Sequence, residues 1–120
     1  MTRALVVKVT AGEDALERCL QGLSVAATAA AAGAAVSLWL TGEAAWLALP
    51  GRAEALSLPH SPPPAELLHA LLSAATVTVC SQCAVRRGIG ADDVLAGVRM
   101  AGAAVFVEEV LAEGVQALVY

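Results

Sequence analysis

Short apolar runs alternate along the chain with longer segments whose apolar residues recur at helical spacing. The runs at residues 4–10, 35–40, 76–79 and 115–120 contain several valines and leucines and few polar residues, which predicts strands buried on both faces. A weaker run at residues 54–58 predicts a further short strand. Lys8, in the run at residues 4–10, is the one charged residue of the first four runs.

Two long segments between these runs have a clear apolar stripe. Glu13 and Asp14 suit the first turn of a helix that extends to about Ala32, and Gly33 is a natural stop. The stripe of this helix consists of Leu16, Cys19, Leu20, Leu23 and Ala27. A second helix follows the prolines at positions 59–64, and its stripe consists of Leu67, Leu68, Leu71, Leu72 and Ala75.

Shorter helices complete the pattern. Residues 44–49 favour one or two helical turns, residues 82–87 a short helix ending at Gly88, and residues 101–113 the last helix. Residues 91–93 favour a capped turn. No linker, repeat or composition shift divides the chain, so we expect one domain over residues 1–120.

Strands that alternate with helices predict an α/β fold, a three-layer α/β/α domain with a five-stranded parallel sheet. The simplest order is 3-2-1-4-5, in which the strand ending at Cys80 lies beside the first strand. The active crevice of such sheets lies at the carboxyl ends of the strands, where the order reverses. This reasoning places Cys80 next to Thr10 and Gly12, at the carboxyl end of the first strand.

The composition is unusually apolar. Hydrophobic residues make up 58% and charged residues 15% of the 120 residues, against roughly 45–50% and about 25% in typical soluble domains. Either the fold buries strands on both faces, or partner subunits cover part of the surface, or both hold. The net charge of −4 and the absence of a basic patch argue against nucleic-acid binding.

The uncharged segment at residues 21–41 is long enough to cross a membrane. We do not expect it to do so, because it is mostly alanine and Gly33 divides it into a helical half and a strand-like half. The first residues lack the pattern of a signal peptide. These observations predict a cytoplasmic protein without a membrane span.

Candidate chemistry is concentrated in residues 76–89, where an apolar strand ends at Cys80 and Cys83 follows. A thiolate at the start of a helix is favoured by free backbone N–H groups, and Arg86 and Arg87 add positive charge. We therefore expect Cys80 to be a nucleophile with a lowered pKa. Cys83 can form a disulfide, share a persulfide or pack as a small residue, while Cys19 is expected in the core.

A metal site would be the other use of a Cys-x-x-Cys pair. Zinc usually takes four protein ligands, or three and water, and the remaining candidates are His60, His69 and Cys19. The predicted elements do not bring these residues to the cysteine pair, so no metal is expected. The chain also has no Gly-x-Gly-x-x-Gly or Gly-Lys-Ser/Thr motif, so no nucleotide or flavin cofactor is expected.

The segment Val-Thr-Val-Cys-Ser-Gln-Cys-Ala-Val-Arg-Arg-Gly-Ile at residues 77–89 resembles the cysteine segment of the DsrE/DsrF-like (TusD-like) sulfur relay family. The Gly-Val-Arg-Met-Ala-Gly segment at residues 97–102, followed by a helix and a terminal strand, is similar to the same family's C-terminal half. The resemblance implies a five-stranded parallel fold and oligomers, often trimers or hexamers. It also implies a persulfide on Cys80 in sulfur trafficking between donor and acceptor proteins.

Three interpretations of the function follow. The first is a sulfur carrier or sulfurtransferase-like protein in which Cys80 accepts a sulfane sulfur, Arg86 or Arg87 stabilises it, and Cys83 resolves or shares it. The second is a thiol–disulfide oxidoreductase that uses Cys80 and Cys83. The third is a non-enzymatic oligomeric binding module with structural cysteines. Cys83 separates these interpretations, because some sulfur-relay members of the family have alanine there.

Overall fold

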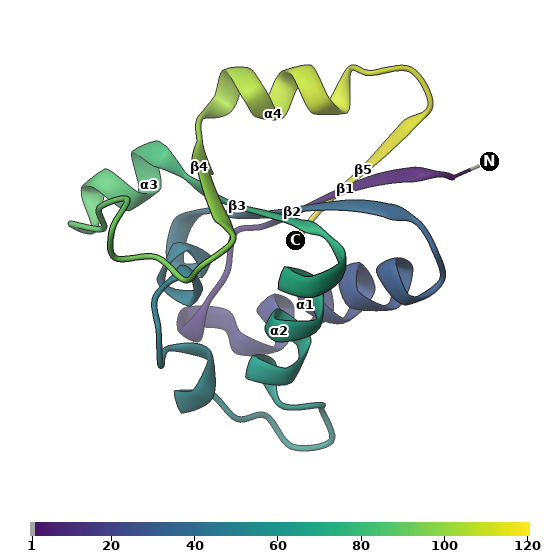
Figure 1. Cartoon of the computed structure of the whole chain (residues 1–120). Helices are drawn as coiled ribbons and strands as arrows, with labels where there is room; N and C mark the ends of the chain where they lie inside the picture. The colour runs from purple at the N-terminus through teal and green to yellow at the C-terminus, as the bar shows by residue number, and fades with distance from the viewer. Residues whose placement is uncertain (1) are drawn as a thin grey trace.

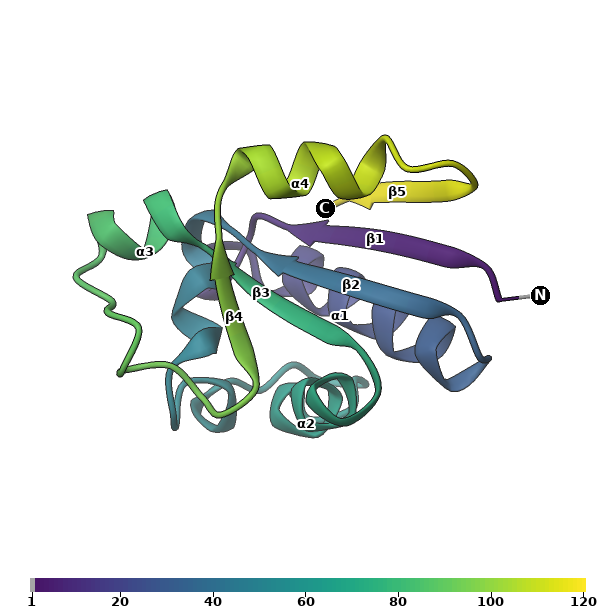
Figure 2. The same ribbon diagram turned by 45° about the horizontal axis from the view of Figure 1, so that its top comes forward.

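The computed structural model describes residues 2–120, and all five of its strands belong to one parallel sheet (Figure 1). The sheet has the order β4-β3-β2-β1-β5, and Figure 2 shows the five strands in this order. The strands are β1 (Ala4–Val9), β2 (Ala35–Leu40), β3 (Thr76–Cys80), β4 (Val98–Ala101) and β5 (Val115–Val119). The predicted α/β fold with a five-stranded parallel sheet is confirmed. Met1 belongs to the predicted domain of residues 1–120 but lies outside the described residues.

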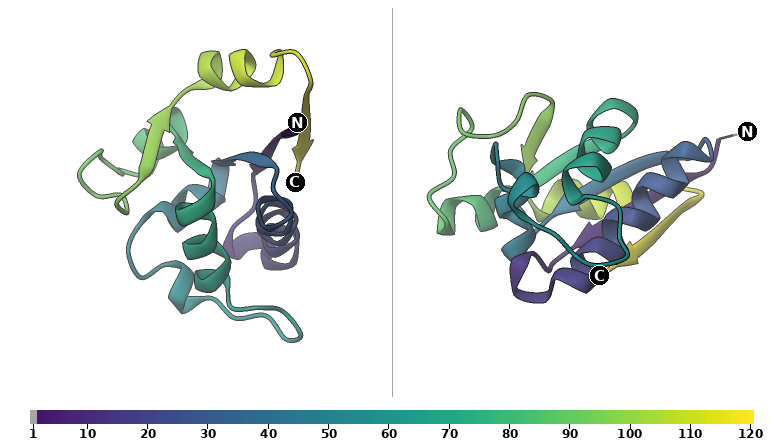
Figure 3. Two further views of the ribbon diagram at one scale, coloured as in Figure 1. Left: turned by 45° about the vertical axis from the view of Figure 1, so that its right-hand side comes forward. Right: turned by 90° about the horizontal axis from the view of Figure 1, so that it is seen from below.

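Helices lie on both faces of the sheet, in unequal numbers. The long helices α1 (Leu16–Ala31) and α2 (Pro64–Ala74) lie side by side under one face (Figure 3). Helix α4 (Ala103–Val110) alone lies over the other face, and α3 (Ser81–Arg86) continues from the end of β3 (Figure 1). The three-layer arrangement is therefore thick on one side and thin on the other.

The main core lies between the sheet and the α1–α2 pair. Alternate strand residues point there, because successive side chains of a strand face opposite sides, and the helices contribute the predicted apolar stripes. This core includes Val7, Val9, Leu38, Leu40, Val77 and Val79 from the strands and Cys19, Leu20, Leu23, Leu68 and Leu71 from the helices.

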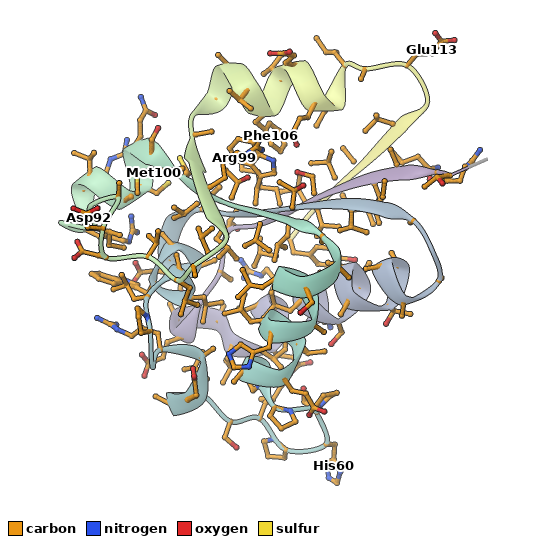
Figure 4. The ribbon with its side chains drawn as sticks, viewed as in Figure 1. His60, Asp92, Arg99, Met100, Phe106 and Glu113 are labelled. Carbon is orange, nitrogen blue, oxygen red and sulfur yellow. The ribbon has the colours of Figure 1, made fainter. Side chains whose placement is uncertain are left out.

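The opposite face carries polar side chains under α4. The strand register aligns Lys8, Trp39, Thr78 and Arg99 in one row across the sheet. Trp39 meets the ring of Phe106 from α4 edge-on, with centroids 5.3 Å apart. Figure 4 shows Arg99 and Phe106 in the layer between α4 and the sheet. Polar and aromatic groups thus replace aliphatic packing on this face.

The sheet runs in both directions from β1, as predicted, but the strand that ends at Cys80 does not have the predicted neighbour. Successive strands add to one side of β1, and a single strand, β5, lies on its other side. However, β2 lies between β1 and β3, so the expectation that the Cys80 strand adjoins the first strand is wrong. The C-terminal strand takes that place instead, because β5 pairs directly with β1.

This difference arises from two segments whose structure the pattern did not predict. Residues 54–58 form no strand; a 3-10 turn, η3 (Ala53–Ala55), precedes extended chain in which Leu56 and Leu58 pack on the core. Prolines close behind this segment disfavour sheet pairing. The strand β4 was not predicted because it has four residues between Gly97 and Gly102, and the predicted helix at 101–113 is shorter, beginning at Ala103.

The uncharged segment at residues 21–41 becomes part of α1, a turn and β2. None of the helices formed by residues 2–120 combines the length and apolar character needed to cross a membrane.

Two glycine-containing turns meet closely at the carboxyl ends of β1 and β2. A Cβ atom at Gly12 would collide with the carbonyl oxygen of Glu43, and one at Gly42 would lie 2.7 Å from that of Thr10. Gly42 also has a φ of +53° and begins the 3-10 helix η2 (Gly42–Ala48). Only glycine fits this contact without displacing backbone.

The substitution Gly42→Ala should therefore destabilise the protein more than the same change at Gly51. Gly51 also has a positive φ, of +82°, but a Cβ atom there would have no other atom within 4 Å. We expect Gly51→Ala to cost about 1–2 kcal/mol from backbone strain alone. Gly42→Ala should cost about 2–5 kcal/mol because the clash adds to that strain. Urea unfolding of both variants measures the difference in the free energy of unfolding. Equal losses of stability would show that the two turns can move apart to accommodate the added methyl group.

Candidate functional site

Cys80 lies where β3 ends and α3 begins. It is the last residue of the strand and the N-cap of the helix, with an extended backbone at φ −63° and ψ 123°. Residues Val77, Thr78 and Val79 before it are buried, whereas Cys80 itself is half-buried. The strand therefore brings the thiol out of the core to the edge of the sheet, as the sequence predicted.

The surroundings of Cys80 favour its thiolate. Burial alone would raise the pKa of the Cys80 thiol, but hydrogen bonds from the backbone N–H groups of Cys83 and Gln82 and from the Cys83 side chain outweigh it. The positive charge of Lys8 acts in the same direction. The pKa of Cys80 consequently lies below its ordinary value of 9.0. A thiolate is the nucleophilic form of cysteine.

Cys83 lies in the first turn of α3 and faces the end of β2. Its Sγ accepts a hydrogen bond of 3.2 Å from the backbone N–H of Gly42, and its side chain also interacts with Cys80. Both thiols are free in this structure. Cys83 is therefore a second thiol at the site, with a backbone donor directed at its sulfur.

The two arginines have different surroundings. Arg87 forms an ion pair with Glu43 at 2.8 Å and donates a hydrogen bond of 3.1 Å from a terminal nitrogen to the carbonyl of Cys83. Arg86 is exposed on the outer side of α3. Arg87 therefore joins the end of α3 to η2, while Arg86 leaves its charge in solvent.

The C-terminal end of α3 is also held by the residues that follow it. Gly88 has a φ of +69°, which turns the chain back so that the N–H of Ile89 bonds to the carbonyl of Ala84 at 2.9 Å. Ile89 then enters the core, where it is 4% exposed. A helix of six residues is thereby fixed at both ends.

Thr10 and Gly12 lie at the carboxyl end of β1, two strands away from β3. The Thr10 hydroxyl donates to the carbonyl of Tyr120, and the N–H of Gly12 donates to the Asp14 carboxylate. Both residues contact the turn at Gly42 and Glu43, and this turn itself contacts α3. They therefore support α3 only indirectly, through η2.

The remaining metal-ligand candidates lie elsewhere. Cys19 is fully buried in the main core, and burial, with a smaller contribution from Asp14, raises the pKa of its thiol to about 11. His60 lies at the far end of the molecule from α3 (Figure 4), and His69 is exposed on α2. Among residues 2–120, no three histidine, cysteine or acidic side chains gather as a metal site would require.

Several residues of the site were not predicted. Gly42 and Glu43 follow β2, the strand that separates β1 from β3, and contact α3 as described. Lys8 adds its positive charge to the hydrogen bonds that lower the pKa of Cys80. A lysine inside an otherwise apolar strand was the available signal for Lys8, whereas no local pattern indicates that residues 42–43 meet α3.

The chain just beyond Cys80 lines a hollow in the surface. A shallow hollow of about 330 Å³ is lined by Ser81, Gln82, Val85 and Arg86. Val85 is 75% exposed there. On the other side, Ala101 of β4 pairs with Cys80, and a Cβ atom at Gly102 would lie 3.2 Å from the Ser81 hydroxyl.

A family model named DsrE/DsrF-like family matches residues 4–119, which is nearly the whole chain. The chain belongs to the DsrE/DsrF-like family. This confirms the resemblance drawn from residues 77–89, and the match includes every strand of the sheet.

Two solved structures have the same fold as this family member. The YchN protein of E. coli aligns over 100% of both chains with a TM-score of 0.80 and 19% sequence identity. The protein of unknown function MTH1491 from Methanobacterium thermoautotrophicum also aligns over 100% of both chains, with a TM-score of 0.68 and 11% identity. At these identities the likeness extends to the fold alone. No curated protein sequence matches the chain.

The three cysteines should differ in their reaction with iodoacetamide. Cys80 should react first, with a rate that rises through a midpoint below pH 9.0, because its lowered pKa gives more thiolate near neutral pH. Cys19 should remain unmodified in the folded protein because it is buried and its pKa is raised. Tandem mass spectrometry of timed samples distinguishes the sites, and a Cys80 midpoint at or above 9.0 would contradict the arrangement described.

Proposed function

We propose that this protein is a small sulfur carrier, with sulfurtransferase-like activity, that bears a persulfide on Cys80. The single observation that supports this most strongly is a half-buried thiol with a lowered pKa at the carboxyl end of β3, in a DsrE/DsrF-like chain. Such a thiol forms the nucleophilic thiolate more readily than an ordinary cysteine, and it is accessible to a second molecule. A cysteine pair with a chemical and not a structural role is typical of a reducing compartment, so we place this chemistry in the cytoplasm.

The loading step is a nucleophilic exchange. The Cys80 thiolate attacks the outer sulfur of a donor persulfide, R–S–SH, forming the new sulfur–sulfur bond of Cys80–S–SH. The bond between the two donor sulfurs breaks, and the donor leaves as the thiolate R–S⁻. No external oxidant or reductant is needed, and unloading to an acceptor thiol is the same exchange in reverse.

Cys83 gives this chain a second route for the bound sulfur. Its thiolate can attack the outer sulfur of the Cys80 persulfide and take it over, which leaves Cys80 as a thiolate. It can instead attack the inner sulfur, which forms a Cys80–Cys83 disulfide and releases hydrogen sulfide. The interaction of the two side chains supports both routes.

Loading should be visible as a gain of one sulfur atom. Incubation with a persulfide donor, followed by intact mass measurement, should give a gain of about 32 Da. Cys80→Ser should abolish the gain, because it removes the attacking thiolate, whereas Cys19→Ser, a change at a buried thiol outside the site, should retain it. The absence of an adduct on folded protein, or an adduct that survives Cys80→Ser, would sink the proposal.

The same measurement addresses the thiol–disulfide oxidoreductase alternative, which the nearness of Cys83 to Cys80 supports. That function requires a reversible loss of two hydrogens, with a potential in the physiological range, and no added sulfur. In Cys83→Ala a sulfur carrier keeps its adduct on Cys80, while an oxidoreductase loses its activity. A binding module with structural cysteines would show neither reaction.

We further propose that the protein assembles into a homo-oligomer, a trimer or a hexamer, through the thin side of the sheet. Exposed apolar side chains are concentrated on α4, the turn that follows it and β5. They are Val107, Leu111, Leu118 and Val119, with exposures of 47%, 77%, 40% and 65%. Strand β5 is also an edge strand of the sheet, and edges of this kind are usually covered. A second copy of the chain is the occupant that fits the high apolar content.

Sedimentation velocity tests this assembly. Wild type should sediment as a trimer or larger, and Leu111→Glu together with Val119→Glu should shift it towards the monomer, because charge is costly to bury in an apolar interface. Val85→Glu is the matched control, since Val85 is equally exposed but lies on α3. A monomeric wild type, or a shift caused only by the Val85 change, would contradict the proposed interface.

A further inference from the structure

Lys8 is a charged residue that the strand pattern leaves unexplained. It lies in β1 among buried valines and points to the α4 face of the sheet, the side on which Cys80 also lies. Its ammonium nitrogen is 5.0 Å from the centre of the Phe106 ring. A lysine in a central strand is costly to keep half-buried, so a negative group that it serves is expected nearby.

The other charges nearest to the site are already balanced. Arg87 pairs with Glu43, and Arg99 pairs with Glu109. Burial alone would raise the pKa of Glu109, but hydrogen bonds from Arg99, Ser37 and Trp39 outweigh it and hold that pKa below its ordinary value. Glu109 is therefore charged at neutral pH and compensates Arg99. These are the two ion pairs found within residues 2–120.

Lys8 has no such partner, because neither of those ion pairs includes it. Arg86 of α3 and Glu108 of α4, the remaining charged side chains on the two helices beside Cys80, are exposed to solvent. Lys8 is thus a positive charge outside both ion pairs, and Cys80 lies on the same face of the sheet. The strands β1 and β3 are about 10 Å apart, two strand spacings, which the long lysine stem can bridge in part.

We infer that Lys8 is the counter-charge of the sulfur anion on Cys80, and so a positioning residue of this site. It stabilises the thiolate before loading and the persulfide anion after it. A persulfide is a stronger acid than the corresponding thiol, so the loaded sulfur is also an anion in need of a counter-charge. Phe106 holds the lysine on this face of the sheet by a cation–π contact, while the Glu109 carboxylate beside Trp39 is taken up by Arg99, Ser37 and Trp39. The persulfide part of this inference rests on the proposed function, whereas the thiolate part does not.

The test measures the rate at which iodoacetamide modifies Cys80 across pH. The reagent is neutral, so a change in rate reports ionisation of the thiol and not attraction of the reagent. In Lys8→Met, which keeps an unbranched apolar side chain over Phe106, the rate at pH 7 should fall about 2- to 5-fold, the effect expected for two unit charges across a partly solvated gap. The midpoint of the profile should move upward, and Lys8→Arg should restore both values.

Arg3→Met is the matched control, because it removes an equal charge from an exposed residue just before β1, at the end of the strand away from Cys80. Its Cys80 profile should be that of wild type. Equal profiles for wild type and folded Lys8→Met, or an equal change in Arg3→Met, would overturn the inference. If Lys8→Met does not fold, the wild-type rate at pH 7 can be compared at low and at about 1 M salt, where screening is strong; an unchanged rate would also overturn it.

The outcome stays separate from that of the proposed function. Persulfide loading can fail while Lys8→Met still slows alkylation, and this result would reject the carrier but leave Lys8 as the counter-charge. Loading can succeed while Lys8→Met has no effect, and this result would reject the role of Lys8 alone. If both hold, Lys8→Met should also lose its bound sulfur to a neutral thiol acceptor at a different rate from wild type.

Discussion

The close packing of two backbone turns at the carboxyl edge of the sheet is the constraint on which the site depends. Gly12 and Gly42 let the turns after β1 and β2 approach within distances that no side chain would permit. This approach fixes η2, and η2 supplies the amide that donates to Cys83 and the carboxylate that binds Arg87. The position of α3, and with it that of the Cys80 thiol, follows from these contacts.

The two faces of the sheet have different physical tasks. The face towards α1 and α2 is packed with aliphatic side chains, and it supplies most of the apolar burial that stabilises a domain of this size. On the face towards α4, two cations lie against aromatic rings, Lys8 over Phe106 of α4 and Arg99 over Trp39. A charge can remain half-buried on this second face because the first face supplies most of the apolar burial that stabilises the domain.

The sequence predicted the parts of the structure that rest on local patterns. The helical stripes around Leu23 and Leu71, the strand that ends at Cys80 and the position of Cys80 before a helix follow from residue spacing over one or two turns. The neighbours of β3 do not, because strand order is decided by packing between segments far apart in the chain. A four-residue strand such as β4 carries too little periodicity to compete with the helix pattern that overlaps it.

The same limit applies to the site. Cys80, Cys83 and the arginines are close in sequence, so their clustering could be read directly. The division of labour between Arg86 and Arg87 depends on Glu43, which lies 44 residues before Arg87. The contribution of Lys8 depends on which face of β1 it occupies and on Phe106 near the other end of the chain. These relations exist only once the sheet is assembled.

The firm attachment of α3 has a consequence for how sulfur would move between proteins. Arg87, the amide of Gly42 and the buried Ile89 hold this short helix at three points. A thiol held in this way does not swing between distant sites on a flexible arm. Each partner would have to bring its own reactive atom to Cys80. The rate of exchange would then depend on how well the partner's surface fits the shallow hollow around Val85. A bound sulfur would be retained because few other proteins have a surface that fits this hollow.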